Sequence, residues 1–228
     1  MFLIVGSRVF DPLTSALTNF AEFRYFSFAG GRILNLMKEP EMQGNRVSPE
    51  SGDIVMEHVS FGYQKKTVLH DVSVTMKKGA LTALVGPSGS GKSTLLKLCA
   101  RFYDPQTGKV FFNGTDISKV DPESLMKHIS MVFQNVYLFQ DTIKNNIRFG
   151  KPDATDAEIE EVARKACCHD FIMKLPKGYE TLVGEGGCTV SGGEKQRISI
   201  ARAILKEAPL PLLSIRKMKW MFKKLSIP

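Results

Sequence analysis

The sequence of 228 residues predicts an α/β fold from three observations. A glycine-rich loop stands between an apolar strand-like run and an apolar helix-like run within residues 81–102. Strand-like runs precede this loop at 54–76, and two Ser/Thr-x-x-Glu signals, at 155–158 and 191–194, open helices after it. Strands and helices that share one chain in this order are typical of a layered α/β domain.

The first 39 residues are expected to form a helical stub. Residues 11–39 have apolar side chains at roughly helical spacing, and Pro40 is expected to stop the helix. The apolar positions are Leu13, Leu17, Phe20, Phe23 and Phe28. Residues 40–52 are polar and rich in helix breakers, which predicts a linker before the domain at 53–213.

The domain is expected to begin with strands. The predicted strands are Ile54–Met56, Val59–Phe61, Val68–Met76, Leu81–Val85 and Lys109–Phe112. The last of them precedes Asn113-Gly114, a pair typical of a tight hairpin turn. A helix is expected at Thr94–Phe102, directly after the glycine-rich loop.

Two later helices are predicted from capping boxes, in which Ser or Thr is followed three residues later by Glu. Thr155 and Glu158 open the first, whose apolar face is Ile159, Val162, Ala163 and Ala166. Ser191 and Glu194 open the second, which is expected to run to about Lys206.

The composition argues against membrane-spanning, secreted and nucleic-acid-binding proteins. No apolar run reaches the roughly 20 residues of a membrane span, and no secretory signal is expected. The net charge is +8, but residues 214–228 supply +5 of it, which leaves +3 for residues 1–213. We therefore expect no nucleic-acid partner.

The cysteines are expected to be reduced thiols. They are Cys99, Cys167, Cys168 and Cys188, without a CxxC pair. A metal site that combines Cys168 with His169 is the alternative.

The strongest chemical signal is a GxxxxGK[ST] motif between the predicted strand and helix. It supplies the candidate nucleotide-binding residues Gly86, Ser88, Gly89, Ser90, Gly91, Lys92, Ser93 and Thr94. The glycines let backbone N–H groups turn toward phosphate oxygens, and the positive end of the next helix faces the same anion. Lys92 is expected to reach the β- and γ-phosphates of ATP, and the Ser93 hydroxyl to hold Mg²⁺.

A second motif indicates which family of phosphate-loop proteins the sequence resembles. Ser191, Gly192, Gly193 and Glu194 resemble the signature motif of ATP-binding cassette (ABC) proteins, which contacts the ATP of a partner. Two matches follow the family order: Tyr63 resembles the aromatic residue that stacks on adenine, and Gln134 resembles the glutamine that touches Mg²⁺ and senses the transmembrane partner.

Other stretches resemble exporters in particular. They are Leu138-Phe139, Thr142-Ile143, Asn146-Ile147 and Thr181–Gly187, although the family usually has arginine at the position of Gly186. Residues 11–36 look like the cytoplasmic end of the last transmembrane helix of an exporter half.

The resemblance implies a P-loop NTPase core with an antiparallel β subdomain and a helical subdomain that carries the signature. It also implies that the parent protein is a membrane-spanning half-transporter that works as a dimer, with this chain at the cytoplasmic face of the cell membrane. Its partners would be a transmembrane domain and a second ABC nucleotide-binding domain, in a homodimer or a heterodimer. ATP would close the dimer, and hydrolysis would reopen it.

The sequence departs from the family after Leu213. Ser214 stands where the family has the aspartate that orders Mg²⁺, and Ile215 stands where it has the general base. Pro211 interrupts the strand before them, and the basic tail 214–228 matches neither the D-loop nor the switch histidine. The domain is therefore expected to be incomplete at its C-terminus, through truncation or an out-of-frame extension, although the tail could also be an amphipathic membrane-binding helix.

Three functions stay open from the sequence. The first is a fragment of an exporter ATPase that is inactive by itself. The second is a regulatory or binding module that uses ATP without turnover. The third is an active transport ATPase whose missing segment is supplied elsewhere.

Overall fold

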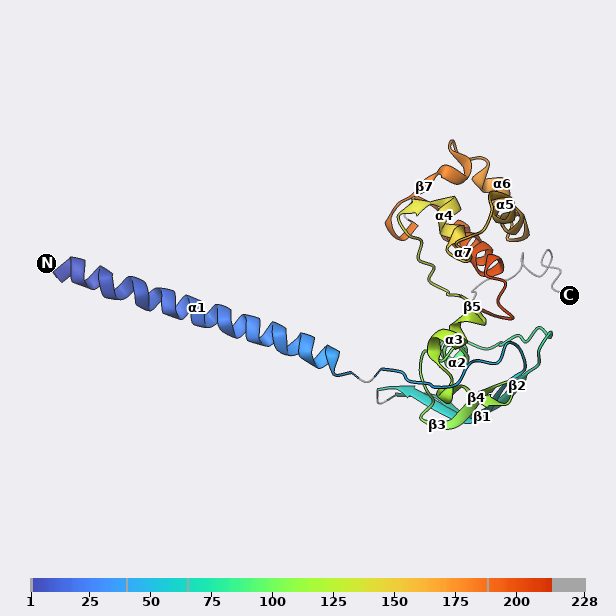
Figure 1. The fold of residues 1–228 in the computed structure, drawn as a ribbon, viewed down its shortest axis with the longest axis horizontal. Coiled ribbons are helices and arrows are strands. Elements are labelled where there is room, and N and C mark those ends of the chain that lie inside the picture. The colour runs from blue at the N-terminus through green and yellow to red at the C-terminus, as the bar shows by residue number, and fades with distance from the viewer. Residues whose placement is uncertain (1, 40, 65, 188, 215–228) are drawn as a thin grey trace. The chain divides into compact units, whose positions relative to one another are not determined.

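The computed structural model describes residues 2–39, 41–64, 66–187 and 189–214. The chain divides into two units, Met1–Met42 and Gln43–Pro228, which are described separately (Figure 1). Pro40, the expected helix stop, and Cys188 lie outside the described residues, as do Ile215 and the rest of the basic tail.

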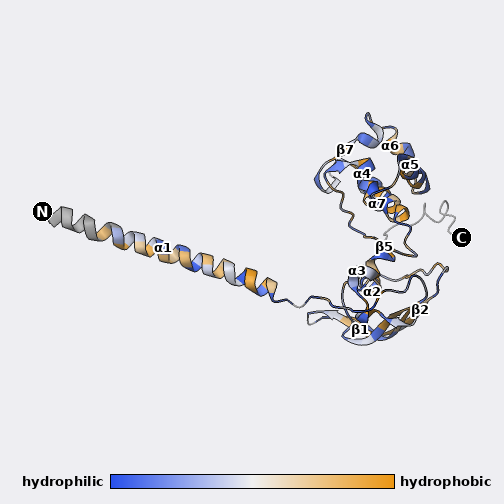
Figure 2. Ribbon diagram, viewed as in Figure 1, coloured by the Kyte–Doolittle hydropathy of each residue, from blue (hydrophilic) through white to orange (hydrophobic). Residues whose placement is uncertain are grey.

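The first unit contains one long helix, α1, at Phe2–Met37. The prediction of a helical stub is confirmed, but the helix begins at Phe2 rather than at Asp11 and contains Pro12 in its interior. Hydrophobic and hydrophilic residues are interspersed along it (Figure 2), and aromatic side chains such as Phe20 and Phe23 are exposed. Among the described residues, no helix combines the length and the apolar character needed to cross a membrane.

The second unit begins with an antiparallel sheet of order β2-β1-β3-β4. Its strands are β1 at Ile54–Tyr63, β2 at Lys66–Met76, β3 at Thr107–Phe112 and β4 at Thr115–Asp116. Asn113 and Gly114 have φ of 48° and 73°, so they form the predicted tight turn between β3 and β4. The expected antiparallel β subdomain is confirmed.

Two further strands pair in parallel. They are β5 at Ile129–Val132 and β8 at Leu210–Leu213. Ile129 and Leu212 are buried with β1, β3 and the helix α2 (Lys92–Cys99), whereas Val132 is buried among the later helices. Pro211 is compatible with β8 because Leu210 donates its N–H group to the carbonyl of His128, just before β5, and Ser214 donates its N–H group to the carbonyl of Val132, at the end of β5. The proline nitrogen therefore lies on the side of β8 away from β5.

The predicted strand Leu81–Val85 is wrong. Residues 81–87 have no regular secondary structure, and Val85 is 93% exposed. A strand needs a neighbour that accepts and donates its backbone hydrogen bonds, and none of the described strands pairs with this segment. Apolar sequence alone therefore does not make it a strand.

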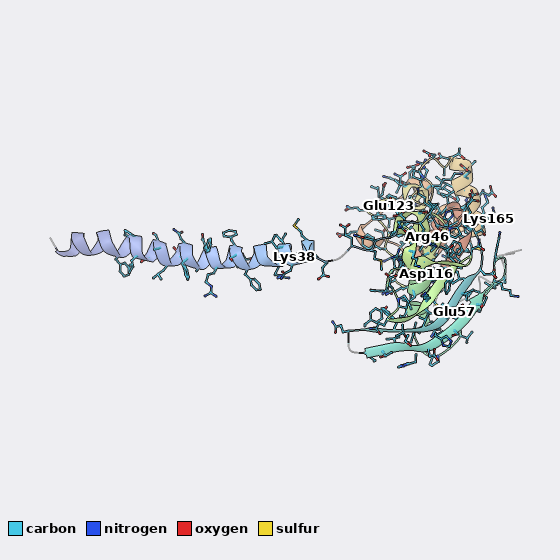
Figure 3. The ribbon with its side chains drawn as sticks, turned by 60° about the horizontal axis from the view of Figure 1, so that its bottom comes forward. Lys38, Arg46, Glu57, Asp116, Glu123 and Lys165 are labelled. Atoms are coloured by element: carbon cyan, nitrogen blue, oxygen red, sulfur yellow. The ribbon has the colours of Figure 1, made fainter. Side chains whose placement is uncertain are left out.

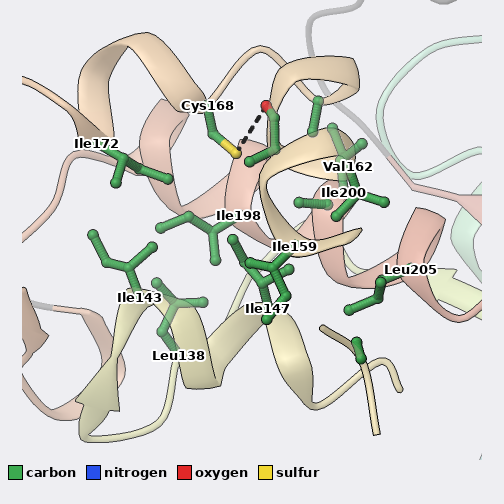
Figure 4. Close-up of a cluster of buried hydrophobic side chains, with 14 of the residues drawn as sticks. Leu138, Ile143, Ile147, Ile159, Val162, Cys168, Ile172, Ile198, Ile200 and Leu205 are labelled. Atoms are coloured by element: carbon green, nitrogen blue, oxygen red, sulfur yellow. Dashed lines mark hydrogen bonds between the residues drawn. The ribbon is translucent and has the colours of Figure 1, made fainter. Parts of the chain in front are cut away.

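The helices α4 to α7 form a separate hydrophobic core (Figure 4). They are α4 at Ile143–Arg148, α5 at Asp156–Lys165, α6 at His169–Ile172 and α7 at Gly192–Leu205. The short strand β6 at Asp141–Thr142 precedes α4, and the short elements η2 at Gly178–Glu180, β7 at Leu182–Val183 and η3 at Glu185–Gly187 lie between α6 and α7 in the chain. The short elements η1 at Ile117–Lys119 and α3 at Pro122–Lys127 pack beside the first sheet.

Both predicted capping boxes are present, at Thr155/Glu158 and at Ser191/Glu194. The predicted apolar face of α5 is buried, and Ile159 and Ala163 are at most 1% exposed. The helical subdomain is thus confirmed.

The capping box of α5 predicts a pH effect. Hydrogen bonds from Lys151 and from the Thr155 backbone and hydroxyl lower the pKa of Glu158 from 4.5 to about 2. A lowered folded pKa gives stability that is complete above pH 4.5 and is lost as the pH falls toward 2. In a thermal melt series from pH 7 to pH 2, we expect Glu158→Gln to lose part of this acid-dependent destabilisation. Glu161→Gln, on the same helix, should retain the full acid-dependent destabilisation. Identical plots of melting temperature against pH for Glu158→Gln and wild type would contradict the prediction.

Candidate nucleotide-binding site

The glycine-rich loop runs from Gly86 to Gly91 and enters α2 at Lys92. Gly89 and Gly91 have φ of +83° and +85°, a conformation that L side chains rarely adopt. A Cβ atom at Gly91 would also lie 2.6 Å from Cδ2 of Leu69. The spacing of the glycines therefore reflects the backbone path of the loop, which leads directly into the N-terminus of α2. A helix N-terminus that follows a glycine-rich loop is typical of phosphate-binding sites.

Lys92 places its positive charge inside this loop. Its Nζ donates hydrogen bonds to the carbonyl oxygens of Gly86 (3.0 Å) and Pro87 (2.6 Å) and to Oγ of Ser90 (3.1 Å). All three acceptors are neutral, so the ammonium charge is not cancelled. A loop that combines this charge with the N-terminus of α2 favours an anion such as a phosphate.

Ser93 and Ser214 meet beside the loop. Their hydroxyl oxygens are 3.2 Å apart, although 121 positions separate them in the chain. Ser214 follows β8, and its N–H donates to the carbonyl of Val132 at the end of β5 (2.8 Å). Gln134 comes two residues after that end and is exposed.

These side chains fit Mg²⁺ only in part. Mg²⁺ takes oxygen ligands, and the Ser93 hydroxyl and the Gln134 amide oxygen could hold it beside phosphate oxygens. The hydroxyl of Ser214 contributes no negative charge at this place. The side-chain oxygens of Ser93, Ser214 and Gln134 are thus all neutral donors.

Tyr63 ends β1 beside the same helix. Its ring packs edge-on against Phe61 and Tyr103, with ring centroids 5.1 Å and 5.4 Å away. Nζ of Lys97 lies 5.9 Å from the Tyr63 ring centroid, and the Tyr63 hydroxyl lies 3.5 Å from Oγ1 of Thr94. Tyr63 is therefore held next to the first turn of α2, partly exposed.

The signature residues lie at the N-terminus of α7. Ser191 is its N-cap, and its N–H and hydroxyl both donate to Oε2 of Glu194 at 2.7 Å, which lowers the pKa of Glu194. Gly192 and Gly193 are exposed, and an added Cβ atom at Gly192 would meet nothing within 4 Å. The end of α7 is therefore open to an approaching group.

The family comparison decides the assignment. The ABC transporter family profile matches residues 69–213, which is more than half of the chain. The chain belongs to the ABC transporter family.

Individual ABC relatives agree with this result. The chain is 51% identical over 157 residues to the mitochondrial iron-sulfur clusters transporter ATM1 of Saccharomyces cerevisiae, covering 68% of this chain and 23% of that protein. It is 43% identical over 182 residues to the ATP-dependent lipid A-core flippase of Saccharophagus degradans, covering 79% of this chain and 31% of the flippase.

A solved ABC structure is also similar. It is a bacterial Atm1-family ABC exporter with ATP bound, which matches with a TM-score of 0.70 and 42% identity. The match covers 76% of this chain and 30% of the exporter chain. The chain thus spans less than a third of the length of each of these three ABC proteins.

The structure groups the ABC motif residues in two sets. Lys92, Ser93 and Thr94 lie together with Tyr63 and Ser214, in or beside the core cluster of the first sheet. Ser191 to Glu194 lie on α7, which packs in the other core cluster. Tyr103 and Lys97, which surround Tyr63, were not predicted, because only folding brings them to that ring and no local pattern marks them.

The alternative of a metal site that combines Cys168 with His169 finds no support in the contacts of these two side chains. Cys99 and Cys168 are buried, and burial raises the pKa of each thiol to about 12. Cys168 donates to the carbonyl of Ala163, and Nδ1 of His169 pairs with the Tyr179 hydroxyl at 2.8 Å. In the described part of the chain, no cluster of three or more metal-ligating side chains is present.

Proposed function

We propose that the chain binds ATP at the loop 86–94 and acts as the ATP-binding part of an exporter. The observation that carries this proposal is the Lys92 ammonium, held among neutral oxygens at the start of α2, in a chain of the ABC transporter family. Binding and hydrolysis of ATP would drive transport in the whole protein. Of the similar proteins, one is named an ATP-dependent flippase and another is an exporter with ATP bound.

Each motif residue has a proposed role toward ATP. The backbone N–H groups of the loop 86–91, apart from Pro87, and the Lys92 side chain bind the phosphates, and Tyr63 stacks on adenine. Ser93 and Gln134 are the proposed Mg²⁺ ligands, and the bound ion would neutralise phosphate charge. Ser191 to Glu194 contact ATP held by a partner.

The proposed partners follow from the exposed signature. A second ABC nucleotide-binding domain, in a homodimer or a heterodimer, would supply the phosphate that approaches Gly192. A transmembrane domain would place residues 53–213 at the cytoplasmic face of the cell membrane. We propose no nucleic-acid partner.

We propose that this polypeptide by itself does not hydrolyse ATP, because a neutral hydroxyl, Ser214, lies beside Ser93. The alternative function is a regulatory or binding module that uses ATP without turnover. Restoration of transport by a separate segment carrying the Asp-Glu pair would favour the exporter part over the module.

Titration with a fluorescent ATP analogue tests the binding proposal. Hydrogen bonds to charged groups are worth about 1.5–3 kcal/mol, so Lys92→Ala should bind about 10–100-fold more weakly. Lys127→Ala, an exposed lysine on α3, should bind like wild type. Equal affinity in Lys92→Ala and wild type would refute the site assignment.

A further inference from the structure

Arg101 is a buried cation that no nucleotide motif explains. It follows the end of α2 in a left-handed conformation, with φ of 52°, and its side chain is 3% exposed. Its guanidinium donates to the carbonyls of Val120, Ser118 (2.7 Å) and Gln43 (2.9 Å) and to Oδ1 of Asp104 (3.1 Å). A buried guanidinium needs such partners, since an unpaired buried charge is strongly destabilising.

One of these partners belongs to the docked segment, which we define as Gln43–Ser48. Its backbone pairs with the end of η1 and the residues after it: Arg46 N donates to the Lys119 carbonyl (3.0 Å), and Asp121 N donates to the Arg46 carbonyl (2.8 Å). Ser48 N donates to Oγ of Ser124 at 2.8 Å. Arg46 is labelled in Figure 3, between the labels of Glu123 and Asp116. About half of the stretch expected to be a linker is thus part of the second unit and is held there by these hydrogen bonds.

Close contact makes this docking specific. A Cβ atom at Gly44 would lie 2.0 Å from the carbonyl oxygen of Val120, the same oxygen that accepts from Arg101. Only glycine therefore lets the docked segment approach so closely. The Val120 carbonyl therefore accepts a hydrogen bond from Arg101 and also lies against the backbone of Gly44.

Helix α2 joins this contact to the phosphate loop. The loop enters α2 at Lys92, and Arg101 stands just after its other end, about 12 Å away along an eight-residue helix. We propose that Arg101 is a positioning residue that clamps the docked segment to α2, so that ATP at the loop tightens the clamp. The nucleotide part of this inference rests on the proposed function.

Trypsin cleavage after Arg46 measures the clamp directly. The Arg46 side chain is exposed, but a protease needs backbone that is free of such pairing. In the 228-residue chain without nucleotide, we expect Gly44→Ala and Arg101→Lys to be cut at Arg46–Val47 at least tenfold faster than wild type. Asn45→Ala, whose backbone N–H to Lys119 is retained, is the matched control. Wild type cut as fast as Gly44→Ala would overturn the clamp.

The response to ATP separates positioning from mere packing. Cleavage at Lys177–Gly178 in the helical part serves as the internal reference. Lys177 is exposed, and local hydrogen bonds from Gly178 N to the Leu175 carbonyl and from Glu180 N to the Lys177 carbonyl hold this bond, so its cleavage reports local opening away from the docked segment. With saturating ATP, wild type should be cut about threefold more slowly at Arg46 but not at Lys177, and Arg101→Lys should show no such difference. Equal slowing at both sites, or none while analogue titration shows binding, would overturn the coupling. Absence of binding in that titration would instead refute the proposed function.

Discussion

The 228-residue polypeptide is expected to release no phosphate from ATP above the level of its Lys92→Ala variant. Ser214 lies 3.2 Å from Ser93, where the ABC resemblance places an aspartate that orders Mg²⁺. Its neutral hydroxyl cannot supply that charge. Ile215 stands at the position of the general base and can neither accept a proton nor orient water. General-base assistance alone is typically worth about 10²–10⁴-fold in rate.

The double variant Ser214→Asp/Ile215→Glu tests how much these two positions explain. We expect it to stay inactive too, because catalytic positioning depends on further groups, and the residues after Ile215 match neither the D-loop nor the switch histidine. Phosphate release is measured for wild type and the double variant, with Lys92→Ala as the blank. Turnover in wild type would mean that the catalytic groups are misassigned. Turnover in the double variant alone would mean that those two positions suffice.

Local signals in the sequence predicted local structure well. Asn113-Gly114 specifies its turn because both residues tolerate positive φ, and Thr155 with Glu158 specifies a helix start through its own hydrogen bonds. Likewise the glycines of the phosphate loop determine a backbone path within a few residues. Each of these features depends on neighbours in the chain, so a single sequence contains the necessary information.

Features that depend on distant partners were not predictable in this way. The apolar run Leu81–Val85 resembles a strand but lacks a pairing strand among those described. The docked segment looks like a linker because its polar residues bond to η1 and its neighbours through backbone atoms, which leave no pattern in side-chain type. Arg101 likewise resembles an ordinary surface arginine until folding buries it among three carbonyls.

Asn146→Ala is expected to destabilise the helical core by about 2–4 kcal/mol. Asn146 is fully buried, and its Oδ1 accepts from Phe139 N (2.9 Å) and from Arg202 Nη2 (3.0 Å). Its Nδ2 donates to the carbonyls of Phe139 and Thr142, both at 3.0 Å. Alanine removes both side-chain groups and leaves several partners unsatisfied, and an unsatisfied buried group costs about 1–3 kcal/mol.

Arg202 makes this loss larger than that of an ordinary hydrogen bond. Burial lowers the pKa of Arg202, so its guanidinium already has a desolvation cost that the Asn146 oxygen helps to offset. The same guanidinium lies 5.7 Å and 5.8 Å from the ring centroids of Phe139 and Phe149, and it also donates to the Asn146 backbone carbonyl. Loss of Oδ1 should therefore loosen the aromatic side chains as well as the loop at Phe139.

Urea denaturation of the full chain provides the measurement, with an unchanged m-value as the sign that only stability has changed. Asn146→Asp is the matched control, because it retains an acceptor for Phe139 N and Arg202 but loses both Nδ2 donors. We expect its destabilisation to be smaller than that of alanine, since the carboxylate also pairs with the guanidinium. If alanine cost less than 1 kcal/mol, or if aspartate cost more than alanine, the acceptor role of Asn146 toward Arg202 would not be what stabilises this corner of the core.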